Sequence, residues 1–193
     1  MAFEKFDLSR MDRLNDPARF EGMDPDELWA ALALPDPAVI VEIGAGTGLF
    51  ACRFAEMSPT SIVYAVDMEP AMVEWMRENR AEVAKGVLVP VLSTETTVPL
   101  SDESADAVIM LNVHHELAEP GVTYAEAARL LRPGGRVLVA DFSPEAPGDR
   151  PPRHVRVSAQ GLEETLASAG FIGVEAHDGL PSYSLLTATK PRP

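Results

Sequence analysis

Cysteine and basic residues are both scarce in this chain. Cys52 is the only cysteine, so no internal disulfide can form, which argues against a disulfide-stapled secreted domain and fits a reducing cytoplasm. Acidic residues outnumber basic residues 30 to 16, and the formal net charge is −14 at pH 7. Because such a surface repels phosphate backbones and anionic lipid headgroups, nucleic acids and membranes are poor candidates as partners.

Long hydrophobic runs are also missing. No stretch approaches the roughly 20 apolar residues that span a bilayer, and the N-terminal sequence MAFEKFDLSRMDR lacks the apolar segment of a signal peptide. We therefore predict a cytoplasmic protein with no membrane anchor. A length of 193 residues with 46% hydrophobic content favours one domain with a substantial core.

Apolar runs of strand length alternate with amphipathic segments of helical length from Asp24 onward. This alternation predicts βαβ units and a doubly wound, mostly parallel sheet between two helical layers. The expected strands are 38–43, 61–66, 87–92, 106–111, 136–142, 171–177 and 183–189, and the expected helices are 24–34, 47–57, 70–84, 123–131 and 159–169. The sequence DGLPS between the last two strands is too short for a parallel crossover, so those strands should form an antiparallel hairpin.

The two least regular segments are the N-terminus and the run SPEAPGDRPPRH. Residues 1–23 have weak periodicity and are expected to form an arm that either drapes across the ligand edge of the sheet or is partly mobile, while residues 24–193 form the single domain. The Pro-rich run, within residues 143–157, is expected to be a functional loop without regular structure.

The strongest functional signal is VIVEIGAGTG over residues 39–48. Gly44, Gly46 and Gly48 let the backbone turn tightly and touch a ligand, and the following helix presents unpaired N–H groups at its start. Dinucleotide sites use GxGxxG, whereas this chain has Leu49 at the third glycine position. The spacing therefore fits a ligand carboxylate better than a pyrophosphate.

Two acids accompany this turn. Glu42 precedes it and is placed to meet a ligand ammonium, and Asp67, 19 residues after Gly48, ends the second expected strand where doubly wound folds bind ribose hydroxyls. A ligand with an ammonium and a carboxylate at one end, a ribose and an adenine is S-adenosylmethionine. The alternative is a plain tight turn, with Asp67 serving only as a helix cap.

Four motifs together resemble the class I, Rossmann-like S-adenosylmethionine-dependent methyltransferases, and they cover nearly the whole chain from about Asp24. They are IVEIGAGTG, the acid at the end of the second strand, DAVIMLNVHHEL and RLLRPGGRVLVADF. The chain is most similar to the small-molecule group that includes quinone C-methylases, the methyltransferase type 11 group. The resemblance implies a seven-stranded sheet of order 3-2-1-4-5-7-6 whose seventh strand is antiparallel.

The resemblance also implies a set of cofactor contacts. Met68 should pack on the adenine, Asn112 should lie near the methionine part, and the sequence LSTE replaces the usual GDA-type acid near the adenine amino group. The cofactor-binding candidates are Glu42, Gly44, Ala45, Gly46, Gly48, Asp67, Met68, Ser93, Thr94, Glu95 and Asn112.

Methyl transfer from an activated sulfonium is an in-line displacement that demands alignment and exclusion of water, and S-adenosylhomocysteine is the product. An acceptor with a high pKa also needs a general base, and His114 and His115 after the fourth strand are the candidates, with packing as their alternative role. No metal site is expected, because HHELAE has Glu119 where the zinc motif HExxH needs a histidine.

The acceptor is expected to be a small molecule. Arg153 and His154, together with Arg150 and Arg156, place positive charge in the 143–157 loop, which suggests a carboxylate or phenolate acceptor, the alternative being solvated loop charge. A non-catalytic S-adenosylmethionine-binding protein is the second hypothesis for the whole chain. A nicotinamide-dependent oxidoreductase is the third, disfavoured by Leu49 and the RPGG turn. The oligomeric state, homodimer included, stays open.

Overall fold

A seven-stranded sheet forms the centre of the structure, a computed structural model that describes residues 11–35, 38–149 and 151–193. The strand order is β3-β2-β1-β4-β5-β7-β6, and β7 runs antiparallel to both of its neighbours while the other pairs are parallel. Both the order and the final hairpin confirm the sequence-based expectation. The strands are β1 (Val39–Ile43), β2 (Ile62–Asp67), β3 (Leu88–Leu92), β4 (Ala105–Leu111), β5 (Leu131–Phe142), β6 (Ile172–His177) and β7 (Tyr183–Thr189).

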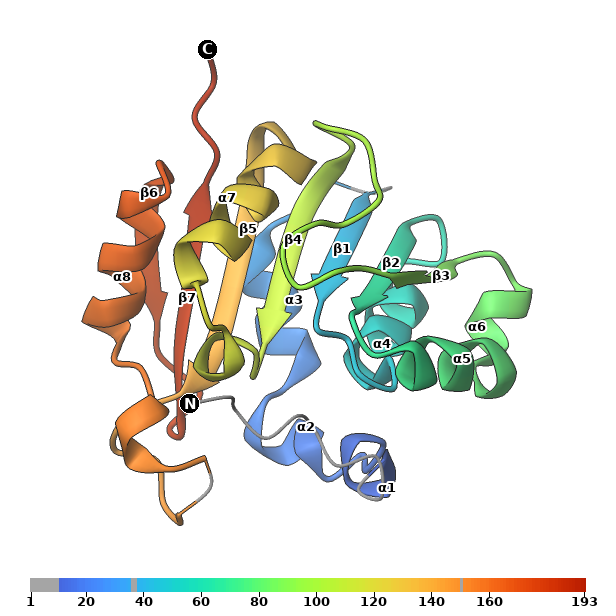
Figure 1. The fold of residues 1–193 in the computed structure, drawn as a ribbon, viewed down its shortest axis with the longest axis horizontal. Helices are drawn as coiled ribbons and strands as arrows, with labels where there is room; N and C mark the ends of the chain where they lie inside the picture. The colour runs from blue at the N-terminus through green and yellow to red at the C-terminus, as the bar shows by residue number, and fades with distance from the viewer. Residues whose placement is uncertain (1–10, 36–37, 150) are drawn as a thin grey trace.

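Helices cover both faces of the sheet. One core cluster lies between the sheet and α3, α4 and α5, and a second lies between the sheet and α7 and α8, which stand in front of the sheet in Figure 1. The helices are α1 (Met11–Leu14), α2 (Arg19–Gly22), α3 (Pro25–Leu32), α4 (Leu49–Met57), α5 (Pro70–Asn79), α6 (Ala81–Ala84), α7 (Pro120–Leu130) and α8 (Ala159–Ser168), with 3₁₀ turns η2 (His114–Glu116) and η3 (Arg153–Val155).

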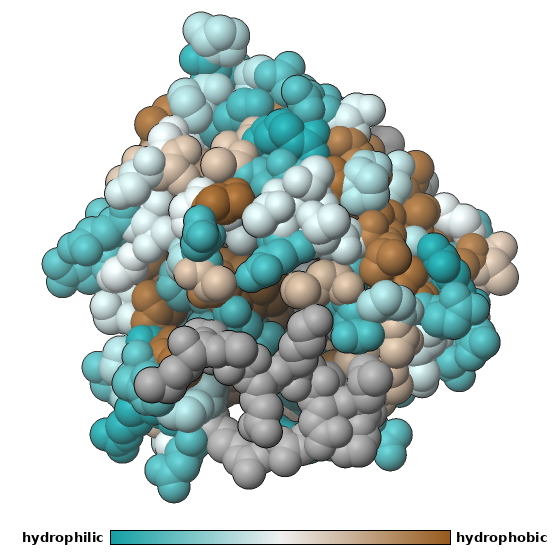
Figure 2. All heavy atoms as spheres, viewed as in Figure 1, coloured by the Kyte–Doolittle hydropathy of each residue, from teal (hydrophilic) through white to brown (hydrophobic). Residues whose placement is uncertain are grey.

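Successive strand residues pack alternately into the two clusters. In β1, Ile40 belongs to the first cluster and Val41 to the second, and both are fully buried. This double burial explains why the strands appear in the sequence as unbroken apolar runs. The surface seen in Figure 2 is largely hydrophilic, with hydrophobic residues in several separate groups. In the described part of the chain, no helix is long and apolar enough to cross a bilayer.

The expected helix over 70–84 is wrong in one respect, because it breaks at Arg80. Arg80 leaves the helical conformation with φ −98° and ψ 114°, which separates α5 from α6. Its guanidinium donates to the carbonyl oxygen of Thr47 at 2.8 Å and to the side chain of Asn15, and it lies 5.0 Å from the Trp75 ring centroid. The break therefore anchors α5 to the turn that follows β1.

The expected boundary between the helix over 123–131 and the fifth strand is also wrong. The helix already begins at Pro120 and ends at Leu130, and β5 begins at Leu131 rather than at Arg136. Leu131 pairs with Ala105 and Arg136 pairs with Ala107, so the residues between them bulge out of the ladder. A bulge of this kind lets RPGG lie inside a strand, although Pro and Gly usually mark its end.

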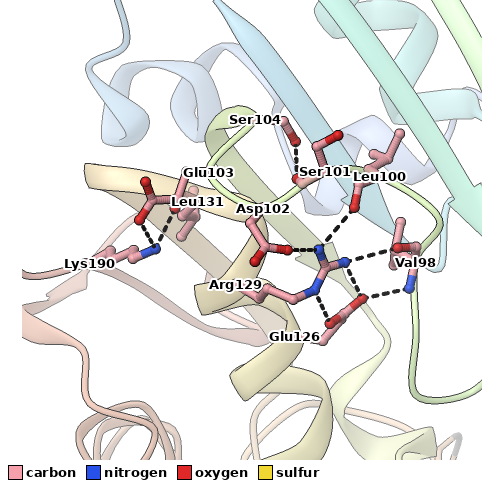
Figure 3. Close-up of polar contacts among 10 residues, drawn as sticks. All are labelled: Val98, Leu100, Ser101, Asp102, Glu103, Ser104, Glu126, Arg129, Leu131 and Lys190. Carbon is pink, nitrogen blue, oxygen red and sulfur yellow. Dashed lines mark hydrogen bonds and ion pairs between the residues drawn. The ribbon is translucent and has the colours of Figure 1, made fainter.

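The connection from β3 to β4 is held by one arginine of α7. Arg129 donates to the carbonyl oxygens of Val98 and Leu100, both at 2.9 Å, and pairs with the carboxylates of Glu126 at 2.7 Å and Asp102 at 2.5 Å (Figure 3). Glu126 in turn accepts the backbone N–H of Val98 at 2.6 Å. The planar guanidinium thus fixes the course of the segment that leaves the carboxyl edge of the sheet after β3.

We expect Arg129→Ala to lower the free energy of unfolding by about 1 to 3 kcal/mol, and Tm by roughly 2 to 10 °C, because two backbone carbonyls and one buried acid lose their donor. Thermal melts check this. Arg132→Ala is the matched control, because Arg132 is more exposed and Asp106 is its side chain's one partner in the part of the chain that the structure describes. It should cost less than about 0.5 kcal/mol. Equal losses of stability in the two variants would contradict the conclusion that Arg129 fixes the segment between β3 and β4.

Candidate functional site

The turn between β1 and α4 lies at the carboxyl edge of the sheet. The strand order reverses here, because β2 and β3 lie on one side of β1, whereas β4 and the later strands lie on its other side. Open α/β sheets bind ligands at such a switch point. The N–H groups of Gly44 and Ala45 both donate to the carbonyl oxygen of Val66, at 2.8 and 2.9 Å. Gly44 and Gly48 both have positive φ, at 73° and 70°. Hydrogen bonds to β2 therefore hold the turn in a conformation that other residues rarely adopt.

Close packing adds to the need for glycine at Gly44. A Cβ atom there would lie 2.4 Å from Cγ2 of Val113, a stiff β-branched side chain. We expect Gly44→Ala to cost about 3 kcal/mol or more and to weaken S-adenosylhomocysteine binding. Gly86→Ala is the control, because Gly86 has a similar φ of 76° and open space around it, so it should cost only about 1 to 2 kcal/mol. Urea unfolding of both variants measures the difference, and equal losses would contradict the packing argument.

Asp67 ends β2 and faces the glycine turn. Its Oδ2 accepts the N–H of Gly46 at 2.7 Å, and its Oδ1 accepts the N–H of Glu69 at 2.9 Å. Burial raises the pKa of this carboxyl above its ordinary value, although the two amides act to lower it. Met68 follows it and is 47% exposed at the same edge. The helix-capping alternative does not hold, because the N-cap of α5 is Glu69 and has no side-chain cap; Asp67 instead orders the backbone of the glycine turn and of the residues before α5.

Glu42 is the most isolated acid of the site. It is 2% exposed, and its Oε2 has no hydrogen-bond partner among the described residues. Burial raises the pKa of Glu42 to about 8, against the lowering effects of Arg19 and of the backbone N–H of Ala51. A buried acceptor without a donor is costly, so this oxygen is a natural partner for a cationic ligand group.

Asn112 supplies a second buried acceptor without a partner. It follows β4 with a left-handed φ of 58°, and its backbone N–H donates to the carbonyl oxygen of Ala140 at 2.8 Å. Its Oδ1 is buried and has no partner within the residues that the structure describes. Such strain at the end of a central strand is typical of ligand sites. The ends of the neighbouring strands β1 and β4 thus each carry a buried oxygen with no partner among the described residues, and such oxygens fit a ligand ammonium.

The segment after β3 contributes less than expected. The N–H of Ser93 donates to the carbonyl oxygen of Asp67 at 3.0 Å, which brings this residue beside the end of β2. The hydroxyl of Thr94 instead accepts the N–H of Thr97 at 3.0 Å within its own turn, and Glu95 is exposed. The contacts of these three residues with an adenine stay a prediction.

His115 forms a dyad with an acid that the sequence reasoning missed. Its Nδ1 lies 2.8 Å from Oδ1 of Asp141, which ends β5 and is completely buried. Burial lowers the pKa of His115, but the hydrogen bond to Asp141 and the charges of Asp141 and Glu116 outweigh it and raise that pKa above its usual value. The sequence signal for this acid is an aspartate inside the apolar run VLVADF. Burying a carboxylate inside a sheet is costly unless it is paired, so such an aspartate is expected to have a partner.

His114 points the other way, into the second core cluster. Its Nδ1 lies 2.9 Å from the hydroxyl of Tyr124, a fully buried residue of α7. Burial lowers the pKa of His114 and keeps it neutral. The two adjacent histidines therefore occupy different environments.

The described part of the N-terminal arm lies across the glycine turn, below the sheet in Figure 1. A Cβ atom on Gly46 would meet Cδ1 of Leu14 at 3.1 Å. Arg19 donates to the carbonyl oxygen of Leu14 at 2.9 Å, and its guanidinium lies 5.2 Å from the Phe50 ring centroid. Burial lowers the pKa of Arg19, against the raising effect of Glu42. Residues 1–10 of the expected arm lie outside the described residues.

The 143–157 loop differs from its expectation. It contains the short turn η3, and the expectation that Arg156 offers its charge to an acceptor is wrong. Arg156 is 8% exposed and donates to the carbonyl oxygens of Pro151 at 2.9 Å, Ala146 at 2.5 Å and Gly148 at 2.6 Å. Arg153 and His154 are exposed on η3, with no side-chain hydrogen bond or ion pair in the described chain. Arg150 lies outside the described residues.

Comparison with known proteins gives a consistent family. A model of the methyltransferase domain matches residues 41–139. The chain is 28% identical to a malonyl-[acyl-carrier protein] O-methyltransferase of Hahella chejuensis over 71% of its own length and 52% of that protein's. It is 30% identical to an arsenite methyltransferase of Halobacterium salinarum over 81% of its own length and 37% of that protein's. The chain thus spans about half or less of these relatives.

A solved structure matches nearly all of the chain. The structure of an S-adenosylmethionine-dependent methyltransferase from Aquifex aeolicus superposes with a TM-score of 0.88 and 26% sequence identity. The match covers 96% of this chain and 99% of that one. The two proteins therefore share their fold.

Proposed function

This chain belongs to the class I S-adenosylmethionine-dependent methyltransferase family, and from that premise we propose that it transfers a methyl group to a small-molecule acceptor. One observation supports the assignment of the cofactor site above the others. Glu42, in the strand before the glycine turn, and Asn112, after the neighbouring strand β4, each have a buried oxygen that no described residue contacts with a hydrogen bond. A ligand ammonium would satisfy both, and it would restore the charged form of Glu42.

The remaining residues have complementary tasks toward the cofactor. The N–H groups at the start of α4 receive its carboxylate, because those of Gly44, Ala45 and Gly46 already have acceptors within the protein. Asp67 retains free lone pairs for ribose hydroxyls after accepting its two amides, because a carboxylate accepts about four hydrogen bonds. Met68 and the Ser93–Glu95 segment border the adenine. When bound, the cofactor supplies a methyl group on an activated sulfonium, so the chain mainly has to align the acceptor and exclude water.

The arm contributes to the exclusion of water. Leu14 lies over Gly46, and Arg19 lies between Phe50 and the acid Glu42. The arm therefore covers the turn at Gly46, while Gly44 stays exposed. The cytoplasmic location and the exclusion of nucleic acids and membranes stay predictions from the sequence, and the oligomeric state stays open.

The acceptor is proposed as a small molecule rather than fixed by the relatives, because the two relatives named above act on chemically unrelated acceptors. An acceptor bound through several thiols is disfavoured here. Cys52 is the only cysteine, and its Sγ lies 3.4 Å from Oε2 of Glu82 in a packed position on α4.

Titration calorimetry tests the cofactor assignment. We expect S-adenosylhomocysteine to bind with one-to-one stoichiometry and NADH to give no heat of binding. Binding of NADH without binding of S-adenosylhomocysteine would overturn the proposal in favour of an oxidoreductase. Binding of S-adenosylhomocysteine without turnover on phenols, thiols, amines or acids would favour the non-catalytic alternative.

A further inference from the structure

The two histidines after β4 are held by different partners. His114 is tied to the buried hydroxyl of Tyr124 by its Nδ1 and anchors the turn to α7. His115 has its Nδ1 on the buried carboxylate of Asp141, and its Nε2 lies 3.7 Å from Oε1 of the largely exposed Glu116. Of the two, only His115 is paired with a carboxylate that can stabilise its protonated form, and Nε2 is the nitrogen that Asp141 leaves available.

We propose that His115 is the catalytic base, that Asp141 is its positioning residue, and that the acceptor is a phenol or an enol whose hydroxyl proton passes to Nε2 of His115. This inference rests on the proposed methyltransferase function and names the substrate class of the same site.

Asp141 fixes both the orientation and the tautomer of the imidazole. It accepts the backbone N–H of His115 at 3.2 Å, the side-chain Nδ1–H at 2.8 Å and the backbone N–H of Phe142 at 2.7 Å. With the proton held on Nδ1, the lone pair of Nε2 is available to receive another. The buried carboxylate then stabilises the imidazolium that forms.

The chemical step balances with the groups at hand. The hydroxyl proton moves to Nε2, and the conjugated electron pair of the acceptor forms the bond to the methyl carbon. The carbon–sulfur bond breaks, and its electrons remain on sulfur. The proton leaves His115 for water through Glu116, whose side chain is 59% exposed. Attack through oxygen or through the conjugated carbon gives an O-methyl or a C-methyl product.

The walls beside the dyad favour a flat, neutral acceptor. The Phe142 ring packs edge-on against His115 with centroids 5.9 Å apart, and the Tyr183 ring packs on Phe142 at 4.8 Å. The groups that act electrostatically on His115 are Asp141 and Glu116, both acidic, while His114 is neutral. Two carboxylates disfavour an anionic acceptor, whereas aromatic faces bind a planar conjugated one.

The test uses the full chain with S-adenosylmethionine and a panel in which catechol and the enol of acetylacetone represent phenols and enols that are protonated at neutral pH, and thiophenol and aniline are the comparators. The wild type should methylate members of the first pair. His115→Gln should lower kcat on them at least 100-fold, since loss of a general base costs about 10²- to 10⁴-fold. Its Kd for S-adenosylhomocysteine should stay within twofold. His177→Gln is the control, because His177 lies on β6 and, among the described residues, its side chain bonds only to Thr187.

Asp141→Asn separates positioning from structure. In the wild type, kcat/KM for phenols should rise with pH through a pKa above the ordinary histidine value of 6.5, because His115 must be neutral to accept a proton. Asp141→Asn should lower the maximal kcat/KM and shift its rise to lower pH. A phenol that is already ionised, such as 4-nitrophenol above its pKa, should be much less sensitive to both variants. NMR titration of the imidazole should show the same fall in the pKa of His115 without any turnover.

Several results would overturn the inference. They are full activity of His115→Gln on phenols, loss of turnover in His114→Gln alone, or methylation by the wild type of thiols or amines only. Unchanged NMR signals of His115 on addition of catechol and acetylacetone to the S-adenosylhomocysteine complex would also overturn it. Each of these leaves the cofactor titration intact, whereas failure of that titration removes the proposed function itself.

Discussion

Replacing Asp67 by alanine is expected to weaken S-adenosylhomocysteine binding at least tenfold in a calorimetric titration. The carboxylate loses its proposed bonds to the ribose, each a charge-assisted hydrogen bond worth about 1.5 to 3 kcal/mol. The N–H of Gly46, which now donates to Oδ2 at 2.7 Å, also loses its partner, so the glycine turn becomes less ordered. Both effects weaken the binding of S-adenosylhomocysteine.

A matched control separates ligand binding from stability. Asp106, like Asp67, is a partly buried carboxylate that accepts a backbone N–H. Its donor is Val39 of β1, at 2.7 Å, and the bond lies at the opposite edge of the sheet. Asp106→Ala should lower Tm as Asp67→Ala does, yet its Kd for S-adenosylhomocysteine should stay within about twofold of the wild type, because distant sites act independently. An unchanged titration for Asp67→Ala would count against the whole site.

The fold could be predicted because its determinants are local. Buried strands give continuous apolar runs, and Asp24 with Pro25 marks the start of α3, where the Asp24 side chain accepts the N–H of Asp26 at 2.9 Å. The two errors in the elements have long-range causes. Arg80 breaks its helix to reach Thr47, 33 residues away, and the bulge before Arg136 follows from pairing with β4. No local pattern carries such contacts.

The residues of the site likewise divide into those that local sequence places and those that long-range contacts bring together. The glycine turn and Asp67 are adjacent to strand ends in the sequence and could be placed from spacing alone. Asp141 and His115 meet only because β4 and β5 are neighbours, and Arg19 approaches Glu42 only because the arm folds back. The role of Arg156 could not be predicted for a related reason. An arginine in a Pro-rich loop is expected to be solvated, but the five N–H donors of Arg156 bind carbonyl oxygens of its own loop.

Glu42→Gln should have opposite effects on the empty protein and on its complex. The pKa of Glu42 is raised from 4.5 to about 8, so between these values the folded state keeps a proton that the unfolded state releases. The contribution of Glu42 to stability is therefore fully present below about pH 4.5, and it falls as the pH rises to about 8. Glutamine does not titrate, and the variant should be more stable than the wild type at pH 8 by about 1 to 3 kcal/mol, or roughly 2 to 10 °C in Tm.

Cofactor binding should respond in the other direction. The glutamine oxygen would turn to the N–H of Ala51, leaving its NH₂ group toward the site, where it opposes an ammonium. Binding of S-adenosylhomocysteine should weaken roughly 10- to 150-fold, as expected for the loss of one charged hydrogen bond. In the wild type, binding below pH 8 should release a proton from Glu42, which calorimetry in buffers of different ionisation enthalpy detects, and the variant should release none. A variant that is both more stable and equally tight in binding would show that Glu42 serves only to cap α4.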